Sequence, residues 1–374
     1  MLVAAIAMVA AACGAATGYA YVFGKERVDI VDPKTAKVIK EITQGVQGTG
    51  TWGDGVTTLD GGYVLINETA KAQVYVFDTA KQELAKAIDV GAKPAHLYLV
   101  NGGTEVWTHS DSEGAFYIID TKSLAVTGKV VASTNGTGHG ALVHADSLGT
   151  NYYATNILEP AVFVIDGKTR TVTKRIDLCQ GANGIGGTHG DGYSSASKMA
   201  YFQCTGATTK TAAVDTTTDT FAGYLDTNGD LFMSPGDRYA VVANGGANRL
   251  DVIDGSTKPE TVTPIAIPNK PDKVYYATVN GKLLAFVDDL KAPDAEVIDM
   301  QTYAVVKSIP GTPLAMPLGT DKLLSRNSNI GGGYYFTVVG DEQQLNIIDV
   351  NTLAMVGSVQ VTGATQVIFA GKQS

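Results

Sequence analysis

Tryptophan, cysteine and histidine are scarce in this chain of 374 residues, which contains 2 Trp, 3 Cys and 5 His. Charged residues make up only 17%, and the 28 Lys and Arg are outnumbered by 37 Asp and Glu. Because the basic residues form no cluster, the sequence lacks the footprint of a nucleic-acid-binding protein. No apolar stretch reaches the roughly 18 residues of a membrane-spanning helix. We therefore expect no nucleic-acid partner, and membrane contact only through an N-terminal anchor.

Signatures of several functional classes are also missing. There is no Gly-x-Ser-x-Gly elbow of a serine hydrolase, and Gly184-Ile-Gly186 lies in no strand-to-helix unit that binds nucleotides. With only Trp52 and Trp107, the tryptophan-rich repeats of quinoprotein dehydrogenases are absent. The stretch 226–230 resembles the start of an EF-hand calcium loop, but Leu231 stands where that loop requires Gly. We interpret it as a turn.

The N-terminal segment carries no charged residue before Lys25. Its sequence AAACG at 10–14 looks like a bacterial lipobox, in which signal cleavage exposes a cysteine for acylation, although the basic region of a signal is missing. We interpret residues 1–18 as a signal or lipoprotein-like leader, with Cys13 as the candidate lipidation site. Residues 19–374 form a single domain in this interpretation. The expected location is the periplasm or the extracellular space, and a cytosolic protein is the alternative.

One phrase recurs along the chain: an alternating apolar strand that ends in Asp, a short turn and a second strand. Its Asp residues follow one another at intervals of 46, 42, 46, 49, 39, 45 and 50 residues and are Asp32, Asp78, Asp120, Asp166, Asp215, Asp254, Asp299 and Asp349. A period near 45 with β-branched strands is typical of four-stranded β-propeller blades. No segment shows a 3.6-residue period, so helices should be almost absent. The repeated Asp side chains should accept hydrogen bonds from the following turn rather than act in catalysis.

The repeat predicts an all-β fold, a β-propeller of eight four-stranded blades. Residues 19–42 supply only three strands, and residues 365–371 are one strand left over. Pairing of these N- and C-terminal strands in the first blade would close the ring and leave no exposed edge. Seven blades is the alternative, if the irregular stretch 315–360 does not form a full blade.

All five histidines lie between residues 96 and 189. Three of them, His96, His139 and His189, occupy equivalent places in consecutive repeats, at intervals of 43 and 50 residues. Each comes where the innermost strand of a blade begins, so the three imidazoles should converge at one mouth of the central channel. Three neutral imidazoles with an open fourth position suit Zn²⁺. The sequence therefore predicts a zinc site here, although copper and nickel also bind imidazole.

A fourth ligand could come from the same mouth of the channel. The strand 104–109 runs antiparallel beside the strand that starts at His96. It places His109 and Asp111 near the same mouth of the channel as His96. We expect Asp111 to be the carboxylate ligand. His109 is either the alternative fourth ligand or a residue that hydrogen-bonds to one of the ligands. His144 lies five positions after His139 and should face the other side of the strand. We interpret it as structural, with a weak second site beside Asp146 as the alternative.

Apart from Cys13, the chain contains Cys179 and Cys204. Cys179 opens the glycine-rich loop that leads to His189, and Cys204 ends the second strand of the same blade. Both should lie at one end of this blade, which makes a disulfide geometrically reasonable. A disulfide would also fit an oxidising compartment. Two reduced, buried thiols are the alternative.

At the level of the repeat, the chain resembles the YVTN/YncE-like propellers, whose blades share the strand–Asp–turn–strand phrase. Residues 93–206 are also similar to the AztD family of periplasmic zinc metallochaperones. The motifs of this closer likeness are KPAH (93–96), DSEG (111–114), GHG (138–140) and the arrangement Cys179…His189-Gly190…Cys204. The resemblance implies zinc binding by His96, His139 and His189, with Asp111 as their partner. It also implies service to the substrate-binding protein of a zinc ABC importer.

The sequence as a whole predicts a monomeric, exported, zinc-binding propeller that acts as a metallochaperone or zinc store and not as an enzyme. Two alternatives come from other classes. One is a metal-free surface or scaffold propeller that binds protein or glycan through its loops. The other is a metal-dependent, lactonase-like hydrolase, which would need Asp111 or Asp191 as its general base.

Overall fold

The structure is a computed structural model that describes residues 18–145, 148–181, 186–206, 208–257, 260–291, 294–310, 326–339 and 343–371, except for the side chains of Asp191, Arg326 and Val339. Residues 1–17 of the predicted leader 1–18, with Cys13, lie outside the described residues, and so does Asp146. Helix within the described ranges is limited to short 3-10 turns such as η1 (Thr69–Lys71), as the sequence predicts. None of the described helices has the length and apolar character needed to cross a membrane.

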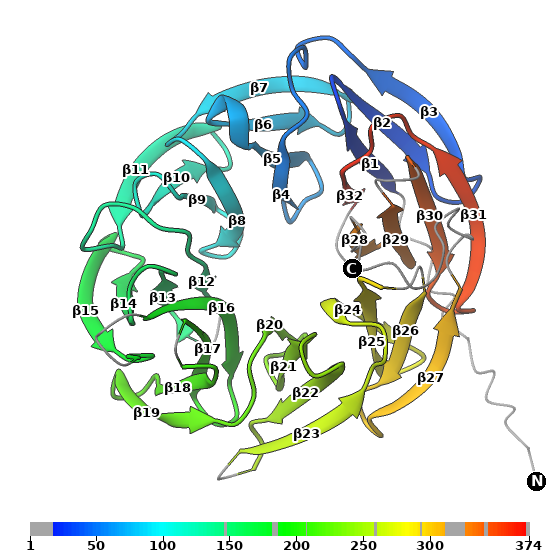
Figure 1. Cartoon of the computed structure of the whole chain (residues 1–374). Helices are drawn as coiled ribbons and strands as arrows, with labels where there is room; N and C mark the ends of the chain where they lie inside the picture. Colours follow the sequence, from blue (N-terminus) through cyan, green and yellow to red (C-terminus); the bar gives the residue numbers. More distant parts are fainter. Residues whose placement is uncertain are drawn as a thin grey trace, which may run out of the picture.

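The strands form eight four-stranded antiparallel sheets arranged around a central channel (Figure 1). The first blade contains β1 (Gly18–Gly24), β2 (Arg27–Asp32), β3 (Lys37–Ile42) and the C-terminal β32 (Gln366–Gly371). The second to fourth blades contain β4 (Trp52–Thr57), β5 (Tyr63–Glu68), β6 (Gln73–Asp78), β7 (Glu83–Asp89); β8 (Pro94–Val100), β9 (Glu105–Ser110), β10 (Ala115–Asp120), β11 (Ala125–Val131); and β12 (Leu142–Val143), β13 (Asn151–Thr155), β14 (Ala161–Asp166), β15 (Thr171–Asp177).

The remaining four blades follow in chain order around the ring. They contain β16 (Gly186–Ser194), β17 (Met199–Gly206), β18 (Thr211–Asp215), β19 (Thr220–Leu225); β20 (Asp230–Met233), β21 (Tyr239–Asn244), β22 (Arg249–Asp254), β23 (Thr261–Ala266); β24 (Pro271–Val279), β25 (Lys282–Asp289), β26 (Ala295–Asp299), β27 (Ala304–Ile309); and β28 (Arg326–Gly331), β29 (Tyr334–Val339), β30 (Gln344–Asp349), β31 (Ala354–Gln360). The eight-bladed prediction is confirmed. Seven blades are excluded because β28–β31 form a complete sheet.

The C-terminal strand closes the ring. β32 pairs antiparallel with β1, with Tyr21 opposite Ile368, and takes the innermost place in the first blade. Thr57 in the next blade donates a hydrogen bond to the carbonyl of Phe369. The predicted closure by pairing of the two chain ends is therefore confirmed, and it gives the first blade its fourth strand.

The repeated Asp residues hold the hairpin turns between the third and fourth strands. Asp120, for example, accepts hydrogen bonds from the backbone N–H groups of Lys122 and Ser123. All eight members of the series accept at least one such bond from the turn that follows. Their structural role, expected from the repetition, is thus observed in every blade.

The hydrophobic core lies between neighbouring blades. Between the first two, Phe23, Trp52, Tyr75 and Phe77 form one aromatic cluster, and the Trp52 indole N–H donates to the carbonyl of Gly24. Each fully buried aromatic side chain contributes about 1.5–3 kcal/mol. The outermost strands are exposed along most of their length, as in β3. The interfaces between blades therefore fix the inner strands, which carry the site described next.

Candidate metal centre

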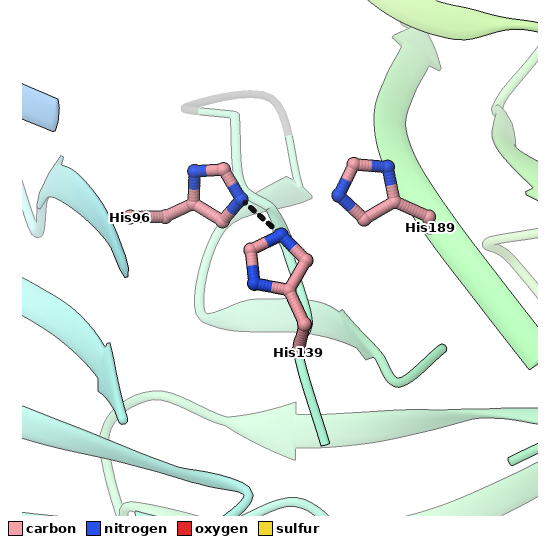
Figure 2. Close-up of side chains that lie close together, drawn as sticks. All are labelled: His96, His139 and His189. Carbon is pink, nitrogen blue, oxygen red and sulfur yellow. Dashed lines mark hydrogen bonds between the residues drawn. The ribbon is translucent and has the colours of Figure 1, made fainter. Parts of the chain in front are cut away.

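Three histidines from three consecutive blades converge at the channel (Figure 2). His96 lies in β8, His139 just before β12 and His189 in β16. Their candidate ligand atoms all lie within 4.8 Å of one another, and Nε2 of His96 is 3.0 Å from Nε2 of His139. We call these residues the histidine triad. The structure thus brings together the three histidines that the repeat spacing singled out.

Local irregularities in the inner strands aim these side chains. The pairing register of β8 shifts between Pro94 and Leu97, and that of β16 shifts between His189 and Gly192. A bulge bends a strand and redirects a side chain that regular pairing would place elsewhere. His96 therefore lies within a bulge, and His189 lies at the edge of one.

Two glycines set the position of His139. Gly138 has a φ of +123°, and a Cβ at this residue would overlap the side chain of Asn156. A Cβ at Gly140 would overlap the carbonyl of Thr155. Only glycine fits at both places. The Gly-His-Gly sequence therefore lets the backbone pass close to the fourth blade and present its imidazole to the channel.

Each triad histidine contacts a carboxylate through the nitrogen that faces away from its neighbours. The three contacts of Nδ1 with a carboxylate oxygen are His96–Asp54 at 2.7 Å, His139–Asp111 at 3.0 Å and His189–Asp230 at 3.1 Å. An ionised carboxylate can only accept, so each Nδ1 carries the proton and each Nε2 presents a lone pair. Such carboxylate–histidine pairs are the usual support of metal-ligating imidazoles.

The three carboxyl groups are ionised well below neutral pH. Burial acts to raise the pKa of Asp54, but the hydrogen bond with His96 and the nearby positive charges together outweigh it and lower the pKa. For Asp111, burial is likewise outweighed by hydrogen bonds from two imidazoles, which hold its pKa well below the usual range. The hydrogen bond with His189 is the main cause of the lowered pKa of Asp230. Each triad histidine therefore faces an ionised hydrogen-bond acceptor at its Nδ1 atom at neutral pH.

In the neutral rings with Nδ1–H, the inward-facing Nε2 atoms carry the lone pairs. Nε2 of His189 is buried and has no hydrogen-bond partner in the structure. His96 and His139 approach each other through Nε2 at 3.0 Å, a contact that requires either a proton on one of the two nitrogens or a cation shared by both. Three imidazole nitrogens fit zinc and related transition metals and do not fit calcium or magnesium, which prefer oxygen ligands.

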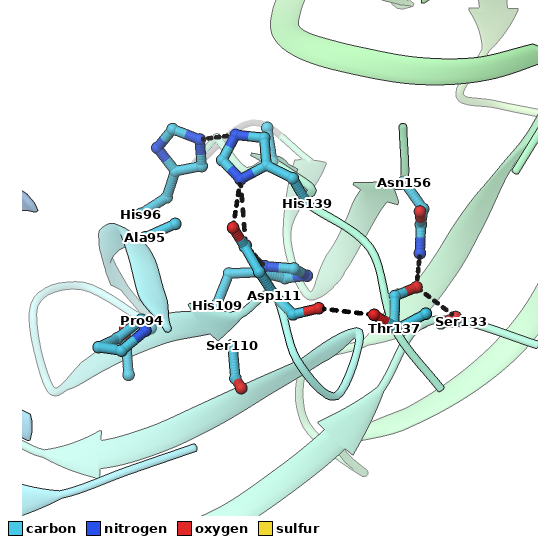
Figure 3. A network of polar contacts seen from close by, with 12 residues as sticks. Pro94, Ala95, His96, His109, Ser110, Asp111, Ser133, Thr137, His139 and Asn156 are labelled. Carbon is cyan, nitrogen blue, oxygen red and sulfur yellow. Dashed lines mark hydrogen bonds and ion pairs between the residues drawn. The ribbon is translucent and has the colours of Figure 1, made fainter. Parts of the chain in front are cut away.

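Asp111 and His109 stand behind the triad (Figure 3). Asp111 contacts Nδ1 of His139 with both carboxylate oxygens and also accepts from Nδ1 of His109 at 3.0 Å. It therefore lies on the Nδ1 side of His139, away from the three Nε2 atoms. His109 is 1% exposed, and burial lowers its pKa, which favours the neutral ring. The backbone N–H of Gly138 donates to the carbonyl of Asp111, which joins the two loops.

Sequence reasoning missed two of the supporting carboxylates, although a signal was present. Asp54, His96, His139, His189 and Asp230 follow one another at intervals of 42, 43, 50 and 41 residues, which is the blade period. The same channel position is thus occupied by an ionisable residue in five consecutive blades. The sequence analysis assigned no role to Asp54 and interpreted Asp230 as part of a turn, although both lie at the blade period from the histidines.

The remaining site predictions concern His144 and the cysteines. His144 lies outside the triad: its Nδ1 contacts the carbonyl of Leu142, and its ring packs on Tyr98. The predicted disulfide is confirmed, because Cys179 and Cys204 are bonded, with Cα atoms 5.1 Å apart. Cys204 pairs with Thr188 in the sheet. The disulfide thus ties the start of the loop to the strand beside His189.

A cavity of about 460 Å³ adjoins the triad on the channel side. His96 and His189 form part of one wall, together with their partners Asp54 and Asp230. Other residues of the lining come from β20, β24, β28 and β32, including Lys273, Tyr275, Asn327 and Gln366. The triad is therefore accessible to a small ligand from the channel.

No family model matches the chain, and a search of curated proteins finds no match to its sequence. Among solved structures, dihydro-heme d1 dehydrogenase NirN in complex with DHE is similar with a TM-score of 0.71, at 14% identity over 94% of this chain and 74% of that one. Apo AztD from Citrobacter koseri is similar with a TM-score of 0.69, at 13% identity over 96% of this chain and 98% of that one. The computationally designed Ika8 protein has a TM-score of 0.64, at 10% identity over 87% and 95%. The predicted likeness to an AztD-type propeller is confirmed for the fold, and at these identities the comparisons show the fold alone.

Proposed function

Because the chain has the propeller fold of AztD and three converging imidazoles, we propose that it is an exported zinc-binding protein that stores zinc or delivers it to the substrate-binding protein of a zinc ABC importer. The observation that carries this proposal is the arrangement of the triad. Every Nδ1 contacts a carboxylate, and the three Nε2 atoms face one another at the centre of the triad.

The chemistry required is passive coordination. His96, His139 and His189 would hold the ion through Nε2, and the fourth position of a tetrahedral site would open toward the channel cavity. Asp111, with His109 behind it, would position His139. Because protons compete with zinc for imidazole nitrogen, acidification should release the ion. The site thus suits a cargo that has to be taken up and given away.

Export is supported by the disulfide. Structural disulfides persist in oxidising compartments such as the periplasm and are rare in the cytosol. The bond between Cys179 and Cys204 therefore fits a periplasmic or extracellular protein. A lipid anchor at Cys13, the importer-type partner and a monomeric state remain parts of the same proposal.

The lactonase-like alternative needs a general base near the metal. Asp111 is unsuited to this role because two imidazoles hold its carboxylate in the ionised form and lower its proton affinity. We therefore favour binding over hydrolysis.

The test is elemental analysis of protein purified without chelator or affinity tag, followed by zinc titration against a competing chelator. One tightly held zinc per chain is expected for the wild type, and none for the triple variant His96/His139/His189→Ala. His144→Ala makes the same kind of change outside the triad and should keep full stoichiometry. Circular dichroism checks that both variants fold. Metal-free wild type that does not respond to added zinc would overturn the proposal and favour the scaffold alternative.

A further inference from the structure

The segment that carries His139 has little regular sheet pairing. β12 pairs with β13 only through Leu142 and Val143, so His139 lies before the regular ladder. A metal site needs its ligands held to within about 0.5 Å, so contacts other than the ladder have to position this imidazole. We call residues 156–160, which join β13 to β14, the 156–160 turn. This turn supplies the contacts that the ladder lacks.

Asn156 opens this turn, and its fully buried side chain bonds to the segment before His139 (Figure 3). Its Nδ2 donates to the carbonyl of Thr137 at 2.9 Å, and its Oδ1 accepts from the backbone N–H of Leu158 at 2.9 Å. The next residue, Ile157, donates its backbone N–H to the carbonyl of His139 at 2.8 Å. Both ends of the amide are thus used, and the turn holds the ligand segment at two points.

The same turn also bonds to the strand that carries His189 in the next blade. The backbone N–H of Asn156 donates to Oγ1 of Thr188 at 3.0 Å, and the N–H of Thr188 donates to the carbonyl of Asn156 at 2.9 Å. A Cβ at Gly187 would overlap the carbonyl of Ile157, so a side chain there would push β16 away from the turn. Asn156 therefore bonds beside two of the three triad histidines, whose ring centroids lie 5.1 Å apart.

The third histidine of the triad, His96, is held by an amide in a similar way. Asn67 in β5 is fully buried, and its Nδ2 donates to the carbonyl of Ala95 at 2.9 Å. Its Oδ1 accepts from Oγ1 of Thr108 in β9 at 2.8 Å. Both ends of this amide are again used, so its orientation is fixed. Two buried asparagines thus bond to the backbone one or two residues before each triad histidine.

We infer that Asn156 and Asn67 are positioning residues of the metal site, which hold the backbone beside the triad histidines so that the three Nε2 atoms meet at one point. This inference rests on the proposed zinc site. Neither asparagine would touch the metal. Each would act through directional hydrogen bonds, because a shift of the bonded backbone would leave buried polar groups unpaired. The distance between ligands from different blades would therefore be set before the metal arrives.

The test compares Asn156→Ala and Asn67→Ala with the wild type, each as the full chain. Competition with a chelating dye should show one zinc per chain bound about 10–100-fold more weakly, the effect typical of residues that support metal ligands. The visible absorption bands of the Co²⁺-loaded variants should shift, because the ligand geometry changes. In the metal-free protein, hydrogen exchange followed by mass spectrometry should become faster at 137–141 and 186–190 in Asn156→Ala. Circular dichroism checks folding, and Asn67→Ala carries the test if Asn156→Ala does not fold.

Asn346→Ala is the matched control, because Asn346 is also buried but lies in β30 and accepts from Ser358 in the outer strand of the eighth blade. It should leave the zinc affinity, the cobalt bands and the exchange at 137–141 and 186–190 unchanged. Wild-type zinc affinity and cobalt bands in both site variants would overturn the inference, and so would an equal loss of affinity in the control. Failure of the wild type to bind either metal would instead overturn the proposed function, and exchange in the metal-free variants would still show whether the asparagines hold these segments.

Discussion

Asp111 shows how much of the site depends on a single side chain. It accepts hydrogen bonds from His139 and His109, and its backbone carbonyl accepts from Gly138 and Thr137. The residue thus fixes the tautomer of one ligand and the position of the loop that carries this ligand. The sequence predicts Asp111 to be a carboxylate ligand of the metal, whereas its observed contacts are those of a residue that orients His139.

Replacing this carboxylate tests the difference. Asp111→Asn should lower zinc affinity by about 10–100-fold with the stoichiometry unchanged, because an amide cannot accept from two imidazoles as a carboxylate does. Competition with a chelating dye measures the affinity. Asp120→Asn makes the same change in a distant turn and should have no effect on zinc. Loss of the zinc itself would indicate that Asp111 is a ligand, and unchanged affinity would contradict the positioning role.

At the scale of the element, the hairpin turns and the bulges of the inner strands have different roles. The turns repeat the same Asp contacts in all eight blades, so they serve the fold. The bulges in β4, β8, β16 and β24 lie in the strands that line the channel, and each contains or adjoins an ionisable side chain, so they serve the site. A regular strand would direct these residues differently.

The turn contacts predict a pH-dependent loss of stability. The backbone N–H and hydroxyl of Ser123 hold the pKa of Asp120 below its ordinary value. A carboxylate whose pKa is lower in the folded than in the unfolded chain stabilises the folded state at pH values above its unfolded pKa of about 3.9. This contribution disappears as the pH falls through the pKa of the folded state. Asp120→Ala should therefore cost about 1 kcal/mol at pH 7 and less at pH 3.

Urea unfolding of the wild type and the variant at both pH values measures this difference. Lys122→Ala is the comparison, because it keeps the backbone N–H donor and removes only the weak attraction of the ammonium, so it should cost less than Asp120→Ala. A cost that is the same at pH 3 and pH 7 would show that the carboxylate charge is not the cause.

The disulfide acts on one blade and on the loop that precedes His189. It joins residues separated by 25 positions, and a cross-link of that span stabilises by about 3 kcal/mol through the unfolded chain. The double variant Cys179/Cys204→Ala should lower the free energy of unfolding by about this amount. Dithiothreitol should lower the urea midpoint of the wild type and leave that of the variant unchanged. A wild-type midpoint insensitive to the reductant under unfolding conditions would contradict this role.

At the scale of the whole molecule, closure of the ring positions the site. β32 is the innermost strand of the first blade and also contributes Gln366, Val367 and Ile368 to the channel cavity. The triad and the two Asp positions that flank it lie on five consecutive blades, so their convergence depends on the curvature of a closed ring. A propeller without β32 in its first blade would lose the contacts of this strand with the neighbouring blades and the part of the cavity wall that the strand forms.

Removal of the closing strand tests this dependence. A chain that ends at residue 364 loses four buried side chains of β32, Val367 to Ala370, and should lose several kcal/mol of stability and its cooperative thermal transition. A chain that ends at residue 371 keeps the strand and is the control. Thermal unfolding followed by circular dichroism compares the two. Identical transitions would show that the first blade is stable without β32.

The sequence by itself determined the fold and the histidines. Eight repeats of strand, Asp and turn specify eight blades, because alternation and turn chemistry are local properties that a short window of sequence contains. The leftover strand at 365–371 indicated the closure, and the two cysteines indicated the disulfide. The spacing of His96, His139 and His189 placed them at one mouth of the channel for the same reason, since each repeat builds the same unit.

The tertiary structure alone decided the roles around the triad. Asp54 and Asp230 pair with histidines one blade away, and Asp111 faces Nδ1 of His139 rather than the Nε2 atoms. Lys273 faces the same cavity from the opposite wall. These relations depend on the angle between blades and on bulges that redirect single side chains, and neither is encoded in a local pattern. Residues in equivalent strand positions become neighbours only because the ring curves and closes around one axis.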